Sequence, residues 1–132
     1  MSYLLDTHTL LWLRLSPEKL PEAHQEIIAD ARMPKIISTI TVWEISLKFA
    51  IGKLDLGGNN PEEFLRSAVH LGFQVMAPES TQFASFYQLA HVTGHKDPFD
   101  RMLIWQAIQN NLTLLSHDRQ LPNYKPHGLM LA

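Results

Sequence analysis

Four acidic residues of this chain lie where a predicted strand ends or a predicted helix begins: Asp6, Glu44, Asp100 and Asp118. In an open sheet of parallel strands, ligands bind beyond the carboxyl ends of the strands, so these side chains are expected to meet at one edge. Carboxylates packed that closely repel one another unless a cation lies among them. Mg²⁺ and Mn²⁺ prefer oxygen ligands, and two such ions about 4 Å apart can support hydrolysis of a phosphodiester without a nucleophilic side chain. The pattern therefore predicts metal-dependent phosphate chemistry.

Each of these acids also has a purely structural interpretation. Asp and Glu favour helix N-termini, where they cap backbone N–H groups and interact with the helix dipole. Taken singly, Glu44, Asp97 and Asp100 fit that role. Asp6 and Asp118 fit it less well, because a carboxylate next to the end of a buried strand lies in a crowded, partly dry place and needs a partner or a cation. The coincidence of all four favours a metal site.

Short apolar runs alternate with amphipathic stretches along the chain, a pattern typical of a parallel sheet covered by helices on both faces. The predicted strands are 3–5, 36–38, 73–77, 113–116 and a short 129–131. The predicted helices are 9–15, 21–31, 41–51, 61–72, 79–89 and 98–110. We expect one α/β domain over residues 1–132, with no internal repeat.

Two of the predicted helices have clear start signals. Thr41 and Glu44 have the S/T-x-x-E spacing of a capping box, which predicts Thr41 as the N-cap. Asp97 followed by Pro98 predicts another N-cap, with Asp100 in the first turn of that helix. Asp100 reaches the other acids only if this end of the helix folds back to the same sheet edge. The sequence pattern leaves that open.

Charge and composition narrow the class of protein. The net charge is −2, from 11 basic and 13 acidic residues, so the chain has no basic excess of the kind that usually marks a nucleic-acid binder. Two bound divalent cations would cancel the charge of four carboxylates and leave the remainder mildly positive. The absence of cysteine excludes disulfides, thiolate chemistry and sulfur-bound zinc.

The hydrophobic segments are short. No apolar run approaches the roughly 18 residues of a membrane span, and the apolar N-terminal stretch is interrupted by Asp6 and His8. We therefore expect no membrane segment, no signal peptide and a cytoplasmic location.

Several other side chains are weaker candidates. Lys48 follows Glu44 by four residues, which is either a helix-stabilising pair or a cation at the rim of the site that orients a carboxylate or a phosphate. Arg101, next to Asp100, could contact phosphate or lie in solvent. The spacing of His91 and His95 is a weak zinc signal without a third ligand. The three tryptophans, at 12, 43 and 105, are expected in the core or a subunit interface rather than under a nucleobase, and Trp43→Ala is expected to lower stability.

These residues fall into segments that resemble PIN-domain ribonucleases, and more narrowly the VapC-type toxins of bacterial type II toxin–antitoxin pairs. The resemblance covers nearly the whole chain and is most specific at Asp-Pro-Phe-Asp-Arg. The matching segments are Leu4-Leu5-Asp6-Thr7-His8, Ser38-x-x-Thr41-x-Trp43-Glu44-Ile45-x-x-Lys48, His95-x-Asp97-Pro98-Phe99-Asp100-Arg101 and Leu114-Leu115-Ser116-x-Asp118.

The resemblance implies a three-layer α/β/α fold with a short, mainly parallel central sheet, and Mg²⁺- or Mn²⁺-dependent cleavage of RNA. It places the four acids named first in the family's acidic tetrad, as catalytic residues and metal ligands. Asp97 either joins this site or only caps its helix, and we favour the cap. Thr7 and Ser116 match positions where a hydroxyl lies near the metal. The resemblance also implies a homodimer, inhibited by a small cognate antitoxin that covers the site.

Two other interpretations compete with a nuclease. A haloacid-dehalogenase-like phosphatase also has an acid after its first strand, but it uses Asp-x-Asp, and here His8 occupies the second position. A PIN-like module that only binds RNA or a protein is the non-enzymatic alternative. Four clustered carboxylates without a metal would destabilise the fold, which argues against a module that has lost its activity.

Overall fold

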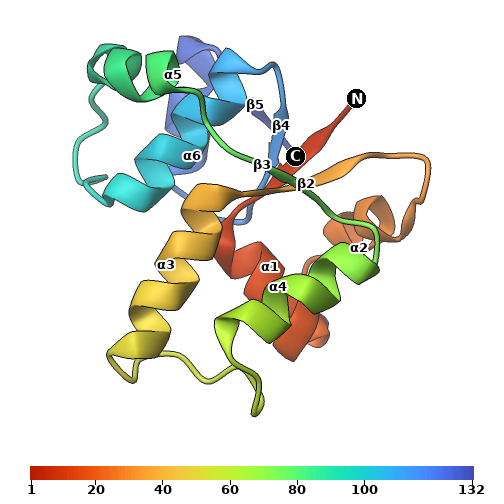
Figure 1. The fold of residues 1–132 in the computed structure, drawn as a ribbon. Coiled ribbons are helices and arrows are strands. Elements are labelled where there is room, and N and C mark those ends of the chain that lie inside the picture. The colour runs from red at the N-terminus through yellow and green to blue at the C-terminus, as the bar shows by residue number, and fades with distance from the viewer.

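The computed structural model describes residues 1–132 and is built on a five-stranded sheet (Figure 1). All neighbouring strands are parallel, in the order β3-β2-β1-β4-β5. The strands are β1 (Tyr3–Leu5), β2 (Lys35–Ser38), β3 (Gln74–Met76), β4 (Thr113–Leu115) and β5 (Met130–Leu131). The parallel sheet predicted from the sequence is confirmed.

Helices connect the strands and pack on both faces of the sheet (Figure 1). The α-helices are α1 (Thr7–Leu15), α2 (Glu22–Ala29), α3 (Thr39–Ala50), α4 (Pro61–His70), α5 (Ser80–Ser85) and α6 (Pro98–Gln109). Short 3₁₀ segments occupy Pro17–Lys19, Phe86–Gln88 and Leu121–His127. The helix predicted over 79–89 is therefore a short α-helix followed by a 3₁₀ turn. None of the helices has the length and apolar character needed to cross a bilayer.

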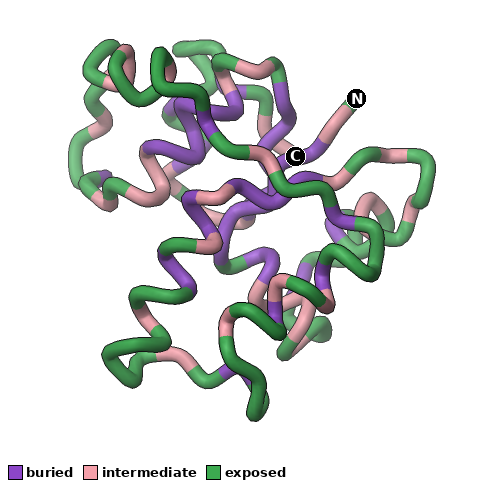
Figure 2. Tube along the Cα trace, viewed as in Figure 1, coloured by how far each residue is buried: buried purple, intermediate pink, exposed green.

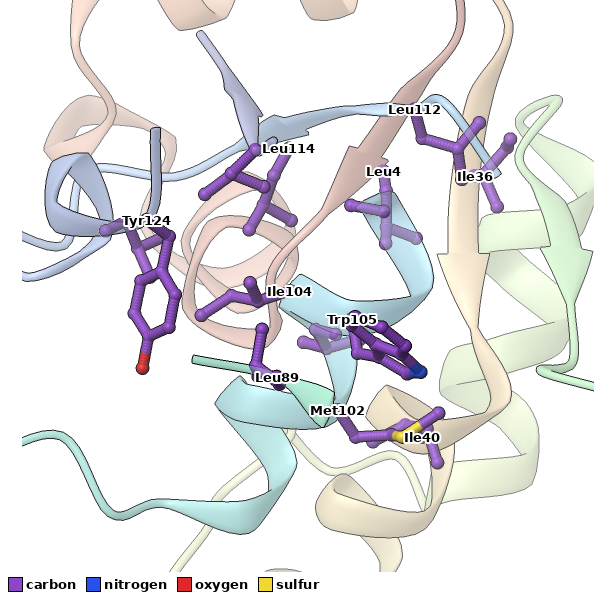
Figure 3. Close-up of a cluster of buried hydrophobic side chains, with 14 residues drawn as sticks. Leu4, Ile36, Ile40, Leu89, Met102, Ile104, Trp105, Leu112, Leu114 and Tyr124 are labelled. Carbon is purple, nitrogen blue, oxygen red and sulfur yellow. The ribbon is translucent and has the colours of Figure 1, made fainter. Parts of the chain in front are cut away.

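Neighbouring residues of each central strand face two separate cores. Successive side chains of a strand point to opposite faces, so Leu4 joins the core on the α6 side while Leu5 joins the core beneath α1, α3 and α4. Ile36 and Ile37 alternate in the same way. Figure 3 shows the first core, where Trp105 of α6 packs near Leu4 and Ile36. The central strands β1, β2 and β4 and the helix faces turned toward them are buried, whereas the edge strands β3 and β5 are not (Figure 2), and this arrangement confirms three layers.

The strand order creates a natural binding position between β1 and β4. From β1 the chain moves outward through β2 and β3, then returns to the other side of β1 to form β4 and β5. Ligands of open α/β sheets bind at such a reversal, beyond the carboxyl ends of the strands. Asp6 directly follows β1, and its backbone N–H donates to the carbonyl of Leu115 at the end of β4 (3.2 Å). The topology therefore brings the chain after β1 and the chain after β4 together.

The predicted capping box at Thr41 is wrong. Helix α3 begins two residues earlier, and its N-cap is Ser38, whose hydroxyl accepts a hydrogen bond from the N–H of Ile40 (3.0 Å). Serine at the end of β2 offers the same capping oxygen as threonine, and the chain turns into the helix at the first such residue. The shift places Glu44 in the second turn of α3, where its side chain is 1% exposed.

Of the two places expected for Trp43, the core is wrong, because this residue is 61% exposed, and a subunit interface stays a prediction. Trp105 is the core tryptophan, at 8% exposed, and its indole N–H donates to the carbonyl of Gln82 (3.0 Å). Trp12 is half-buried and stacks on His117, with ring centroids 4.0 Å apart. Helical spacing of apolar residues predicts an apolar face, but it does not show which residues of that face are covered by the sheet.

The two tryptophans give a matched test of this packing. Trp105→Ala is expected to lower the free energy of unfolding by about 3–5 kcal/mol, because it removes a buried indole and leaves a cavity. Trp43→Ala is expected to lower it by about 1 kcal/mol or less, because most of that indole is already in water. Urea denaturation of both variants beside the wild type measures the difference. Equal losses in the two variants would contradict the assignment of the core.

Candidate metal centre

Asp6 is held in place by hydrogen bonds from both sides of the sheet edge. It is the N-cap of α1: its Oδ1 accepts from the N–H of Thr9 (2.8 Å), which starts this helix at Thr7. Its Oδ2 accepts from the hydroxyl of Ser116, which follows β4. The side chain is 8% exposed, and each carboxylate oxygen retains further lone pairs. Asp6 is therefore a fixed, mostly buried acceptor with capacity for a cation.

Glu44 is buried more deeply and carries its own counter-charge. Its Oε1 accepts from the hydroxyl of Thr7 (2.7 Å), and its Oε2 pairs with the ammonium group of Lys48 at 2.5 Å. Thr7 also lies 3.1 Å from the hydroxyl of Thr41, so the residue expected to cap α3 instead packs beside this carboxylate. A buried carboxylate is tolerated when it is paired in this way. Lys48 is thus both the helix partner of Glu44 and a cation at the site.

Asp100 and Asp118 complete the convergence of acids. Together with Asp6 they line one small cavity, whose apolar walls are Leu103, Leu114 and Leu121. The Oδ1 of Asp118 accepts from the N–H of Gln120 (2.9 Å), and the N–H of Asp118 donates to the hydroxyl of Ser116 (3.1 Å). The start of α6 therefore does fold back to the edge formed by β1 and β4.

The carboxyl group of Asp100 shows the electrostatic cost of this arrangement. Burial, followed by the negative charges of Asp97, Glu44 and Asp6, raises its pKa from 3.8 to about 6, while His95 acts in the opposite direction. No hydrogen-bond donor lies on this carboxylate in the structure. Asp100 is thus the least compensated acid of the site, and a bound cation would supply what the protein does not.

Asp97 has the capping role that the sequence favoured. Its Oδ1 accepts from the N–H groups of Phe99 (2.9 Å) and Asp100 (3.4 Å), which makes it the N-cap of α6. Its charge still acts on Asp100. Whether it also binds a metal stays a prediction.

Arg101 does not join the cluster. Its guanidinium group donates to the carbonyl oxygens of Leu89 (3.2 Å) and Ala90 (3.1 Å) and lies over the ring of Phe86. These contacts tie the start of α6 to the preceding loop. The structure therefore gives Arg101 a role in packing, whereas the hydroxyls of Thr7 and Ser116 both contact site carboxylates.

His95 is the site residue that the sequence reasoning missed. It is 5% exposed, its Nδ1 lies 2.7 Å from the hydroxyl of Tyr124, and its Nε2 lies 3.6 Å from Oδ2 of Asp100. One ligand atom each from His95, Asp100 and Asp118 lies within 4.8 Å of the others. From the sequence, His95 was paired with His91, which is exposed, as a weak zinc signal, and it otherwise stood in the matching segment without an assigned role. The useful signal was its place two residues before the cap of α6, on the segment that carries Asp100.

The donor set fits a divalent cation. The converging groups are carboxylate oxygens and one imidazole nitrogen. Carboxylate oxygens are ligands that both Mg²⁺ and Mn²⁺ accept. The uncompensated Asp100 carboxylate and the unpartnered Nε2 of His95 face one another across the same space. Both features are expected of a site built to hold an ion.

Comparisons with known proteins identify the family and the fold. Residues 3–125 match the PIN domain family. A search of curated proteins found no significant match. Among solved structures, VapBC-1 from nontypeable Haemophilus influenzae has 20% identity, covering 100% of this chain and 97% of that one, with a TM-score of 0.69.

Two further solved structures have the same fold. VapBC from Salmonella typhimurium, in a DNA-bound structure, has 18% identity, covering 100% of this chain and 97% of that one, with a TM-score of 0.69. VapBC2 from Rickettsia felis, bound to a DNA fragment from its promoter, has 17% identity, 100% and 98% coverage and a TM-score of 0.66. At these identities the likeness shows the fold alone.

The raised pKa of Asp100 predicts how the stability of metal-free protein depends on pH. In the unfolded chain Asp100 loses its proton near pH 3.8, whereas in the folded chain it keeps the proton until about pH 6. Between these values the folded state binds more protons, so the contribution of Asp100 to the free energy of unfolding falls as pH rises. Asp100→Asn is expected to be more stable than wild type by about 1–3 kcal/mol at neutral pH, with the difference vanishing toward pH 4.

Denaturant titrations in chelator, at several pH values, measure this difference. Addition of Mn²⁺ is expected to raise the melting temperature of the wild type and to leave that of Asp100→Asn nearly unchanged, because the variant lacks a ligand. A variant less stable than wild type at neutral pH in chelator would show that the Asp100 carboxylate is not strained by its neighbours.

Proposed function

The chain belongs to the PIN domain family, and from this premise we propose that it is a Mg²⁺- or Mn²⁺-dependent RNA endonuclease, the toxin of a toxin–antitoxin pair. The observation that carries the proposal is the convergence of acids from distant parts of the chain. Asp6, Asp100 and Asp118 line one cavity, and the charge of Glu44 acts on Asp100 from α3. Such a cluster costs stability, so a function must maintain it.

The four acids are the residues that would hold the metal. Bound divalent cations activate water and stabilise the oxygens of an in-line phosphodiester displacement. The chain contributes fixed ligand geometry: Ser116 and the N–H of Thr9 hold Asp6, while Thr7 and Lys48 hold Glu44. Groups locked by their own hydrogen bonds keep ligands within the narrow tolerance that such chemistry needs.

An open groove beside the site offers a path for an RNA backbone. Its lining includes His8, Trp12, Lys48 and Lys53 together with the leucines at 11, 15 and 54, and Lys48 also touches the site carboxylate Glu44. Proteins that bind single-stranded nucleic acid usually combine basic side chains along the path of the nucleic-acid backbone with aromatic rings on which bases stack. This local arrangement supports RNA as substrate despite the net charge of −2.

An apolar surface next to the site supports an inhibitory protein partner. The exposed rings of Trp43 and Phe83 border a hollow with Pro98, and Trp43 and Pro98 are direct neighbours of Glu44 and Asp97 in the chain. A partner that places apolar side chains on this surface and a basic side chain over the acids would block substrate and neutralise the cluster at once. We assign this role to the small cognate antitoxin.

Two alternatives are less well supported. The phosphatase needs a second acid two residues after Asp6, and His8 at that position is exposed rather than directed into the site. A module that only binds RNA or a protein would have the same fold and could bind metal. Turnover is the property that separates it from a nuclease.

Cleavage of a total-RNA pool tests the activity directly. Purified, partner-free wild-type protein is expected to cut RNA with Mg²⁺ or Mn²⁺ and to lose activity in chelator. Asp100→Asn is expected to reduce the rate by at least about 100-fold, since loss of even an outer-shell group commonly costs 10–100-fold. Asp55→Asn, at an exposed turn, is the matched control and is expected to cut at the wild-type rate.

The outcomes separate the two interpretations. Full activity in Asp100→Asn would remove this residue from the site. Absence of cleavage by folded protein that binds Mn²⁺ would favour the binding module over the nuclease.

A homodimer stays a prediction, and three exposed apolar side chains in and after α4 and on β3 support it. Val69, Leu71 and Val75 are exposed by 48%, 60% and 42% at the end of α4 and along the edge strand β3. Sedimentation velocity is expected to show a dimer for wild type and a monomer for Leu71→Lys. Ile51→Lys, which alters an equally exposed residue elsewhere (59%), is the control expected to remain dimeric. A monomeric wild type would contradict the prediction.

A further inference from the structure

One buried nitrogen in the acidic cluster has no partner. The side chain of His95 is only 5% exposed, so its Nε2 is shielded from solvent, and this nitrogen makes no hydrogen bond. An unsatisfied buried polar atom is costly and calls for an explanation such as an ion. The atom is directed at Asp100, whose carboxylate likewise has no donor.

The other ring nitrogen of His95 is fixed by a buried tyrosine. Nδ1 lies 2.7 Å from the hydroxyl of Tyr124, a residue that is fully buried in the core drawn in Figure 3. When Nδ1 donates its proton to this hydroxyl, the lone pair is left on Nε2, facing the cavity. Histidines that bind metals are oriented in this way, with the second nitrogen donating to a neighbouring group.

The separation between His95 and Asp100 fits ligands of one ion better than it fits a direct bond. At 3.6 Å, Nε2 and Oδ2 are too far apart for a hydrogen bond. Two donor atoms that each lie about 2.1 Å from one ion can be up to about 4.2 Å apart. The ligand atoms of His95, Asp100 and Asp118 lie within 4.8 Å of one another, so a small inward movement closes the set.

We propose that Nε2 of His95 is a metal ligand, and that with Asp100 and Asp118 it forms a mixed nitrogen and oxygen site selective for Mn²⁺ over Mg²⁺. The inference rests on the proposed function in taking the two carboxylates as ligands, and it adds the nitrogen and the selectivity. Mg²⁺ holds oxygen ligands and releases its waters reluctantly, whereas imidazole suits transition metals. His95 therefore decides which cation occupies this position.

Calorimetric titration of metal-free protein tests the selectivity. In His95→Gln the affinity for Mn²⁺ is expected to fall at least about tenfold, while the affinity for Mg²⁺ changes by less than about threefold, because only the former uses the nitrogen. His91→Gln is the control, since it makes the same change at an exposed residue of the same loop. Equal losses for the two ions, or none, would overturn the proposal.

A spectroscopic measurement detects the nitrogen ligand itself, which a change in affinity alone does not. Pulsed electron paramagnetic resonance of the Mn²⁺-loaded protein is expected to show coupling to an imidazole ¹⁴N nucleus, retained in His91→Gln and lost in His95→Gln. Bound Mn²⁺ without nitrogen coupling would refute ligation by His95 and leave the nuclease standing. Nitrogen coupling in a protein that cuts no RNA would refute the nuclease and leave the metal site standing.

Discussion

The repulsion among carboxylates at the end of the central strands is the constraint on which the rest of this structure depends. Asp6, Asp100 and Asp118 line one cavity, and the buried Glu44 acts on it from α3. The protein compensates three of the acids separately: Asp6 with a serine hydroxyl, Glu44 with a threonine and a lysine, and Asp118 with a backbone N–H. Only Asp100 is left without a donor, so the strain is concentrated where α6 begins. The metal-dependent activity proposed for this chain would require it to tolerate this cost in the absence of an ion.

The parallel sheet makes this concentration of charge possible. Leu4 and Leu5, which precede Asp6, lie in the two cores on opposite sides of the sheet, so a one-residue slip of β1 would move each leucine to the opposite core and shift Asp6 along the sheet. Strand β4 is anchored in the same way. The rigid strands hold Asp6 and Ser116 together, and the caps of α1 and α6 then fix the direction in which the carboxylates approach. Secondary structure and site are thus held by the same hydrogen bonds.

Much of this arrangement could be predicted from the sequence because it depends on local patterns. Buried strands flanked by helices specify a parallel sheet, and a parallel sheet places Asp6 and Asp118 at one edge. Helix starts were harder, since Ser38 and Thr41 offer the same capping chemistry and only tertiary packing selects between them. The exposure of Trp43 and the burial of His95 depend on which face of an element meets its neighbours, and periodicity alone does not carry that information.

The cap of α6 links the metal site to the surface around it. Asp97 fixes the first turn of the helix, so Asp100 faces the cavity while Pro98 is left beside Trp43 and Phe83 on the outside. Acidic and apolar features are therefore held at a constant distance by one short segment. A ligand that recognises both at once gains specificity from their spacing, whereas a small cation uses the acids alone. Because the two features share this rigid segment, the metal, the substrate and the protein partner proposed for this chain would all meet the same few residues.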